Sequence, residues 1–417
     1  MAEKKVWTRR HFLKMAGLGL AATGLAACAP QEQPTPTPAP QPESKPAAAA
    51  PKKLKAAWVY VGPVGDYGWT FAHDLGRKFV EEKFPWLETT YVESVAEGDA
   101  MRIIDRFIQE EGADVVFTTS FGYMDDTIKA GEKYPDKIFF HCSGYKRREN
   151  VGTYFAEFYQ LYYLNGLMAG ALTKSNKLGY VAAHPIPEVV RHINAFTLGA
   201  REVNPDATVD VRWLFSWFDP AKAREAAESM IAQGVDVLAF TEDTPTVIEV
   251  AQEYTEKGQP VYSFAHYSSM QRFGEDACVS GQLVNWGVLY LDILAKVYAG
   301  AYTPKDLADV DYWWMLREKA VELGSKRGVA INPKFEGPLK EKKVKDPILG
   351  EISVYDLIFT RMEQMAEETV VFDPFSGPIR DQDGKERIPA GTRATHDDLW
   401  TMDYFVEGVI GKLEKPA

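Results

Sequence analysis

The histidines, cysteines and glycine-rich segments of this 417-residue sequence could carry out catalysis, but none has a spacing that catalysis uses. There is no Gly-x-x-x-x-Gly-Lys-Ser/Thr phosphate loop, no Gly-x-Gly-x-x-Gly after the first apolar run and no Gly-x-Ser-x-Gly elbow. There is no Cys-x-x-Cys or His-Glu-x-x-His pair, and His184 and His192 straddle a proline-containing turn. We therefore expect no enzymatic activity, no bound metal and no cofactor.

Aromatic side chains are the more informative group. They make up 12% of the chain, with 10 Trp and 20 Tyr, which is more than packing alone usually demands. Trp69, Phe121 and Trp217 stand after apolar, strand-like runs and not within them. Core packing is the alternative explanation for each ring, but a place in the loop after a strand favours a role in a binding site.

The elements that would position these residues alternate between short apolar runs and amphipathic helices from residue 54 onward. This order is typical of a parallel, doubly wound α/β sheet. The first group comprises strands at 55–62, 88–93, 115–119 and 137–141, and helices at 71–84, 99–111 and 125–133.

The same order begins again after residue 155, so we expect two parallel-sheet lobes. The second group comprises helices at 160–173, 187–204, 220–233 and 246–257, and strands at 177–182, 208–215, 235–240 and 259–263. We expect residues 54–154 with about 266–282 in lobe 1, and residues 155–265 with about 283–417 in lobe 2. Further helices are expected at 283–299 and 397–412. Ligands bind at the carboxyl ends of such strands, so two facing lobes predict a cleft that closes by a hinge.

The N-terminal segment has the features of an export signal. Arg9 and Arg10 precede a short apolar run, residues 15–27, that is too short to span a bilayer. The pair indicates the twin-arginine type of signal, and Leu25-Ala26-Ala27-Cys28 resembles a lipobox. We therefore predict a signal peptide at 1–27, lipid on Cys28, and a Pro- and Ala-rich tether at 28–53. An uncleaved apolar anchor is the alternative.

Charge excludes some partners. The chain carries −12, and removal of residues 1–27, with five basic residues and one acidic residue, would leave −16. Such an acidic protein, with a pI near 5.2, is not expected to bind nucleic acid. Lipid chains, not a basic surface, would hold it at the outer face of the cytoplasmic membrane. Cys142 and Cys278 could pair in an oxidising compartment, although nothing local requires it.

Several short motifs in a fixed order resemble the basic membrane protein family, whose purine nucleoside receptor lipoproteins are type members. The motifs are VGDYGW at 64–69, SFGY at 120–123, KYPDKIFF at 133–140, FEGP at 335–338, SGPIRDQDGK at 376–385 and MDYFVEGV at 402–409. The resemblance covers nearly all of residues 54–413. It implies a type I periplasmic-binding-protein fold and a substrate-binding lipoprotein of an ABC importer.

The resemblance also implies a purine held between two aromatic rings in the interlobe cleft. Trp69 matches the ring of the first lobe and Trp217 that of the second, with Phe121 at a matching strand end. Stacking of a base on an aromatic ring contributes about 1–3 kcal/mol. Asp243 matches the family's ligand-binding aspartate, and a helix N-cap role is its alternative.

The stretch at 264–270, Phe-Ala-His-Tyr-Ser-Ser-Met, departs from the family because it lacks the Asp and Lys that contact the sugar in nucleoside-binding members. This loss resembles the free-base branch, so we expect adenine. Asn285, at a hinge, could contact an adenine edge, or could cap the following helix. The remaining candidate ligand-binding residues are Tyr60, Asp66, Tyr67, His266 and Trp286.

The expected function is capture of a purine base for import, by a monomer that works with a membrane permease and an ATPase. Three alternatives remain open. They are a nucleoside-binding protein of the same family, a lipid-anchored nucleoside hydrolase and the ectodomain of a signalling receptor.

Overall fold

The computed structural model describes residues 52–369 and 371–413. The expected signal peptide, the lipidation site Cys28 and nearly all of the expected tether therefore lie outside the described residues. Within the described part of the chain, no helix combines the length and the apolar character needed to cross a bilayer. Residues from Pro51 onward form one compact unit, which is described by itself here.

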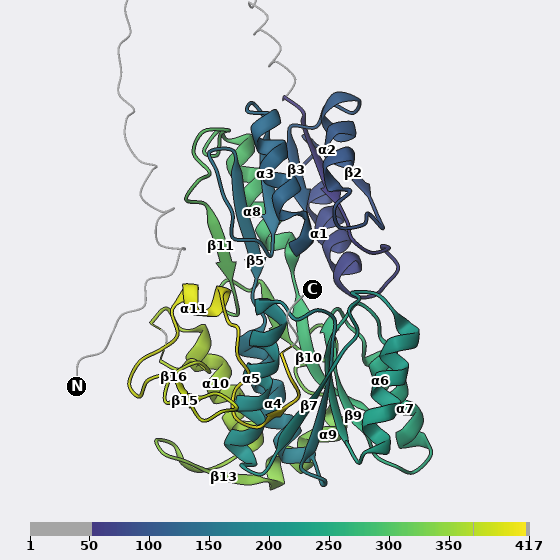
Figure 1. Ribbon diagram of the computed structural model, residues 1–417, viewed down its shortest axis with the longest axis vertical. Coiled ribbons are helices and arrows are strands. Elements are labelled where there is room, and N and C mark those ends of the chain that lie inside the picture. The colour runs from purple at the N-terminus through teal and green to yellow at the C-terminus, as the bar shows by residue number, and fades with distance from the viewer. Residues whose placement is uncertain (1–51, 370, 414–417) are drawn as a thin grey trace, which may run out of the picture. The chain divides into compact units, whose positions relative to one another are not determined.

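The first sheet has the strand order β11-β5-β4-β3-β1-β2, and all its pairs are parallel (Figure 1). Its strands form because they are short apolar runs that can be buried on both faces; five of the six residues of β1 are buried. The strands are β1 (Leu54–Val59), β2 (Leu87–Val92), β3 (Val115–Thr118), β4 (Ile138–Cys142), β5 (Val151–Ala156) and β11 (Asp311–Trp314). The helices are α1 (Trp69–Lys83), α2 (Ala100–Gln109), α3 (Met124–Lys133) and α8 (Trp286–Tyr298), which packs on α1.

The second sheet has the order β12-β10-β9-β8-β6-β7-β17, in which only β12 runs antiparallel to its neighbour. Its strands are β6 (Lys177–Ala182), β7 (Thr208–Trp213), β8 (Val237–Thr241), β9 (Tyr262–Tyr267), β10 (Cys278–Val284), β12 (Val321–Leu323) and β17 (Val409–Ile410). Four helices of this lobe are α4 (Tyr159–Leu172), α5 (Pro187–Val203), α6 (Pro220–Ala232) and α7 (Thr246–Glu256). The two expected parallel sheets are confirmed.

The chain divides between the sheets differently from the expected segments. Residues 278–284, expected largely in lobe 1, form β10 of the second sheet, between β12 and β9. Helix α8 and strand β11 were expected in lobe 2 but belong to lobe 1. Strand β11 is part of the first sheet, and α8 packs on α1. The chain therefore crosses between lobes three times, after β5, after β10 and after β11. The strand at β10 was missed because its run, CVSGQLV, contains small and polar residues.

A C-terminal region extends the second lobe. It comprises α9 (Pro333–Glu341), the β13–β14 hairpin (Lys343–Asp346 and Gly350–Ser353), α10 (Val354–Ala366), the β15–β16 pair (Ile379–Arg380 and Glu386–Ile388) and α11 (His396–Trp400). In Figure 1, the yellow α11 lies close to α5, with which it makes contacts.

The expected closing helix at 397–412 is wrong. Helix α11 starts at a capping box formed by Thr395 and Asp398 and ends at Trp400. Residues beyond it use their backbone groups elsewhere: Val406 donates to the Asn194 side chain, and Val409–Ile410 pair with β7. Gly408, at φ 99°, adopts a conformation that a helix cannot use.

The two cysteines of the described chain do not pair. Cys142 ends β4 in the first sheet, Cys278 begins β10 in the second, and both are free, buried thiols. The disulfide considered from the sequence is therefore absent from this structure.

Candidate functional site

A pocket lies where the carboxyl ends of strands from both sheets meet. It encloses about 270 Å³ that protein atoms do not occupy. Its lining comes from loops after β1, β3 and β4 in one lobe, and after β7 and β8, the end of β9 and the start of α5 in the other. The lining residues are Val61, Trp69, Ser120, Phe121, Ser143, Glu188, Trp217, Asp243 and Tyr267. The position agrees with the expected ligand site of parallel sheets.

Trp69 opens α1 and is fixed by several contacts. Its indole Nε1 donates to the carbonyl of Thr119, at 2.5 Å. Its ring makes edge-to-face contacts with His73, Trp286 and Tyr267 at centroid distances of 4.6, 5.1 and 5.2 Å. These contacts set the plane of the ring in advance, so little side-chain entropy would be lost when a ligand stacks on it.

Phe121 and Trp217 complete the aromatic lining from opposite lobes. Phe121 starts the turn after β3, and Trp217 lies in the loop between β7 and α6. Among the described residues neither ring stacks on Trp69, although all three line the same pocket. The indole nitrogen of Trp217 is buried without a hydrogen-bond partner in the described chain. It could donate to a ligand.

Asp243 is the acidic residue that the sequence predicted for the pocket. It follows β8 and is 1% exposed, and neither of its carboxylate oxygens has a hydrogen-bond partner in the described chain. Burial, with the nearby Asp66 and Glu242, raises the pKa of Asp243 well above its ordinary value. The predicted alternative, an N-cap, is not observed: Pro245 occupies that position of α7.

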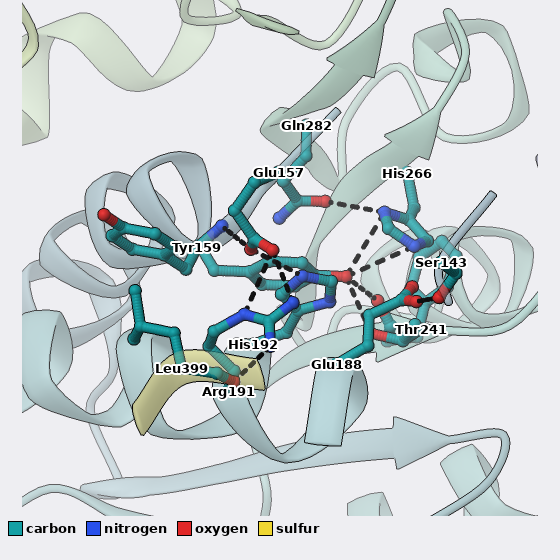
Figure 2. A network of polar contacts seen from close by, with 12 residues as sticks. Ser143, Glu157, Tyr159, Glu188, Arg191, His192, Thr241, His266, Gln282 and Leu399 are labelled. Atoms are coloured by element: carbon teal, nitrogen blue, oxygen red, sulfur yellow. Dashed lines mark hydrogen bonds and ion pairs between the residues drawn. The ribbon is translucent and has the colours of Figure 1, made fainter. Parts of the chain in front are cut away.

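Glu188, Ser143 and Tyr267 line the pocket but were not identified from the sequence. Glu188, in the first turn of α5, accepts a hydrogen bond from Ser143 Oγ, which joins the two lobes (Figure 2). Burial raises the pKa of Glu188 to about 7. A glutamate directly after a proline, as at Pro187-Glu188, is typical of a helix start, so the local sequence did not indicate a role in the pocket.

A buried polar cluster lies next to Glu188 on the same helix. Glu157 pairs with Arg191 at 2.5 Å and with His192 at 3.1 Å, and all three side chains are fully buried (Figure 2). Burial by itself would raise the pKa of Glu157, but the Arg191 charge and the His192 hydrogen bond lower it to about 2. This cluster fixes α5 relative to the segment between β5 and α4, where the chain changes lobes.

Three of the predicted residues near β1 do not line the pocket. Asp66 accepts hydrogen bonds from the backbone N–H groups of Gly68, Thr70 and Phe71, and so caps α1. Tyr67 packs between Phe71 and Phe273, with its carbonyl accepting from Ser268 of the other lobe. Tyr60 is fully buried beside His73.

The other three predicted residues also lie behind the lining. His266 is buried in a hydrogen-bonded group with Tyr162 and Gln282, and burial lowers its pKa well below the ordinary value. Trp286 stacks on His73 at 4.1 Å and supports Trp69 from behind. Asn285 lies at the crossover between β10 and α8, and its side chain makes no capping hydrogen bond.

The pocket therefore offers ring faces, carboxyl groups and few donors. Its lining contains no lysine or arginine, so it does not suit phosphate or carboxylate ligands. Within residues 52–369 and 371–413, no cluster of His, Cys, Asp or Glu could hold a metal ion. This chemistry fits a small, uncharged, planar molecule with hydrogen-bond donors.

Comparisons with known proteins agree with this fold. Residues 53–357 match the profile of the Bmp family, described as "ABC transporter substrate-binding protein PnrA-like". A purine-binding protein of Brucella abortus (strain 2308) is 38% identical over 88% of this chain and 96% of its own. TsgA13 of Haloferax volcanii, whose name proposes that it is a glucose-binding protein of an ABC transporter, is 39% identical over 71% of this chain and 70% of its own.

Solved structures share the fold at low identity. An ABC transporter solute-binding protein from Aeropyrum pernix K1 has a TM-score of 0.63 at 16% identity and covers 83% of this chain and 95% of its own. One from Conexibacter woesei has a TM-score of 0.57 at 16% identity, over 77% and 99%. The two-lobed periplasmic-binding fold is thereby confirmed.

Proposed function

Because the chain belongs to the Bmp family of PnrA-like ABC transporter substrate-binding proteins, we propose that it captures a purine base, adenine before other bases, in the pocket between its lobes. Members of this family bind a substrate outside the cytoplasm and deliver it to a permease and an ATPase. The family therefore confirms that this is a binding protein and not an enzyme, as the missing catalytic motifs predicted.

One observation supports the purine most directly: a buried carboxyl group, Asp243, shares a small pocket with four aromatic rings, those of Trp69, Phe121, Trp217 and Tyr267. A purine offers a face to the rings and an amino or ring N–H to the carboxyl group. The similarity to a purine-binding protein over nearly its whole length supports the same ligand class.

The groups around the pocket favour a free base over a nucleoside. A ribose would need both space and partners for its hydroxyl groups, and the 264–270 stretch lacks the Asp and Lys that would supply them. Unpaired buried hydroxyl groups would each cost about 1–3 kcal/mol.

A hexose is the second candidate, because TsgA13 is as similar in sequence as the purine-binding relative. Aromatic rings and carboxylates can also bind a sugar through its apolar face and its hydroxyl groups. A hexose, however, requires several free hydrogen-bonding groups, whereas the hydroxyls of Ser120 and Ser143 already donate to Glu97 and Glu188.

Calorimetry decides between these ligands. The chain from residue 54 onward, a compact unit of its own, would be partly unfolded, freed of any bound ligand and refolded before titration. We expect adenine to bind more tightly than guanine, hypoxanthine, adenosine and glucose. Tighter binding of adenosine would contradict the free-base assignment. Binding of glucose without any purine would overturn the ligand class.

We further propose that the protein is exported and held at the membrane by lipid on Cys28. The Leu25–Cys28 lipobox and the arginine pair before it support this. Mass spectrometry of the native protein should find acylated Cys28 as the first residue. Recovery of peptides from residues 1–27 in the membrane fraction would contradict it.

A further inference from the structure

The carboxyl group of Asp243 is almost fully buried, and neither of its oxygens has a hydrogen-bond partner of good geometry among the described residues. The donors that face it are few: the backbone N–H of Trp69 lies beside it, and the indole N–H of Trp217 lines the same pocket. The residue's own backbone N–H donates to the Trp217 carbonyl at 2.8 Å, so the backbone is held in place and the side chain faces the pocket. A buried ionised carboxylate with so few donors is costly, so this environment suits the uncharged form.

The groups that face Asp243 from every neighbouring element are acidic or neutral. They are Asp66 from the loop before α1, Glu242 from the loop after β8, Glu188 from α5 and Tyr267 from β9. Among the described residues no lysine or arginine forms an ion pair with it. Burial raises the pKa of Asp66 to about 7, although three backbone N–H groups at the start of α1 donate to it and oppose the shift.

We infer that Asp243 binds its ligand as a neutral carboxylic acid, whose hydroxyl donates to a ring nitrogen while its carbonyl oxygen accepts from the neighbouring amino group. This inference rests on the proposed function. It names the ligand edge that the pocket selects, which is an acceptor nitrogen beside an amino group. The direction of the pKa shift at Asp243, upward through burial and the nearby carboxyl groups, agrees with it.

Adenine has this pattern on its Watson–Crick edge, whereas guanine has it only where its 2-amino group adjoins N3. The amino group of adenine stands next to ring nitrogens that accept hydrogen bonds. In guanine, the ring N–H and the amino group form a pair of donors, which an ionised carboxylate would bind better. The protonation state of one side chain would thus discriminate between the two bases.

Binding should then take up a proton. In an open cleft Asp243 would be in water and ionised at neutral pH, whereas in the closed complex it carries a proton taken from solvent. Because the protonated form binds, affinity is highest at low pH and falls as pH rises above the carboxyl group's pKa in the open form. The fall should approach about tenfold per pH unit once the pH is well above that pKa.

The first test is calorimetry of adenine binding in two buffers with different ionisation enthalpies. We expect uptake of about one proton per adenine at neutral pH and the stated fall in affinity with pH. Binding of adenine without proton uptake and with a flat pH profile would overturn the inference and leave the proposed function standing. If the protein binds no adenine, the proposed function fails, and this inference fails with it.

Substitutions identify the group that takes up the proton. Asp243→Asn keeps one acceptor and adds a fixed donor, so adenine should still bind within a few fold, but without the pH dependence. Asp243→Leu removes both and should weaken binding by about tenfold or more. Loss of binding in both variants, with native circular dichroism, would show that the ionised carboxylate is required and would overturn the inference.

Glu188→Gln is the matched control, because Glu188 is the second buried carboxyl group of the pocket. If Asp243 is the titrating group, this variant should keep the pH slope. A slope that disappears in Glu188→Gln and persists in Asp243→Asn would assign the proton to Glu188 and overturn the inference.

Discussion

At the scale of single residues, Trp69 combines a fixed ring with a place in the pocket. The hydrogen bond to Thr119 and the three edge contacts hold it without help from a ligand. A ring held in this way can stack on a planar ligand at little entropic cost. Its contribution should therefore be large for any purine and nearly independent of which purine it is.

We predict that Trp69→Ala weakens binding of the best purine by about tenfold or more, since stacking on one ring contributes about 1–3 kcal/mol. Calorimetry would measure it. Trp86→Ala is the control, because Trp86 stacks on Tyr298 at 3.9 Å and does not line the pocket. Equal losses in both variants would mean that Trp69 acts through stability alone.

Glu157 contributes to the stability of the fold more than to ligand binding. Its pKa of about 2 lies below the value of an unfolded chain, about 4.3. A depressed pKa contributes stability that is fully present above the unfolded value and is lost as pH falls toward the folded value. The protein should therefore lose stability steeply between about pH 4.5 and about pH 2.

We predict that Glu157→Gln lowers the free energy of unfolding by about 3–5 kcal/mol at neutral pH, because it leaves the buried Arg191 charge unpaired. It should also reduce the loss of stability in acid. Denaturant titrations at neutral pH and near pH 3 would measure both effects. Glu407→Gln, in an exposed pair with Arg201, should change stability by less than about 1 kcal/mol. Equal effects of the two substitutions would contradict the assignment.

At the scale of elements, the loop before α1 touches the loop after β8 of the other lobe. A Cβ on Gly68 would lie 2.6 Å from Asp243 Cα and 2.7 Å from its carbonyl oxygen. These are backbone atoms that cannot move aside easily. Glycine at this position is what allows the two lobes to come together.

We predict that Gly68→Ala prevents full closure and weakens ligand binding by about tenfold or more, at a cost of a few kcal/mol of overpacking. Calorimetry would measure the affinity. Gly65→Ala, in the same loop, is the control, since its Cβ would meet nothing within 4 Å. Normal binding by Gly68→Ala would show that closure does not need this contact.

The sequence predicted most of these elements because their apolar periodicity is strong. Helices α1 to α7 agree with the expected ranges to within a few residues. Strand β9 begins at Tyr262 and not near 259, and the run at 151–156 was not identified as a strand. Small and polar residues in β5 and β10 conceal strands that are defined only by their neighbours in the sheet.

At the scale of the whole described unit, three crossovers join the lobes and two side-chain hydrogen bonds bridge them. Ser268 donates to the Tyr67 carbonyl, and Ser143 donates to Glu188. Both bonds and the Gly68 contact belong to a closed arrangement. Opening would break them and expose the pocket, as in hinge-bending proteins generally.

We predict that ligand shifts the protein from open to closed forms. Small-angle X-ray scattering of the ligand-free protein should give a larger radius of gyration than that of the saturated protein. Ser268→Ala should enlarge the difference by favouring the open form. Identical scattering with and without ligand would mean that the empty protein is already closed.

Four of the pocket's lining residues were predicted: Trp69, Phe121 and Trp217 because each follows a strand, and Asp243 from the resemblance to the family. It could not identify Glu188, Ser143 or Tyr267. These residues reach the pocket because the two lobes face each other, and no local sequence pattern predicts that arrangement. Asp66, conversely, lies where the sequence predicts a ligand-binding residue, but its side chain caps α1.

Strand β17 has a consequence for how the protein behaves in concentrated solution. It pairs with β7 at Val209 and Asp210, and the Trp213 side chain further along β7 donates to the carbonyl of Lys412. An open sheet edge is a template on which a second molecule can add its own strand, which leads to fibres or precipitates. The last residues of the described chain cover that edge, and so they favour solubility as separate molecules.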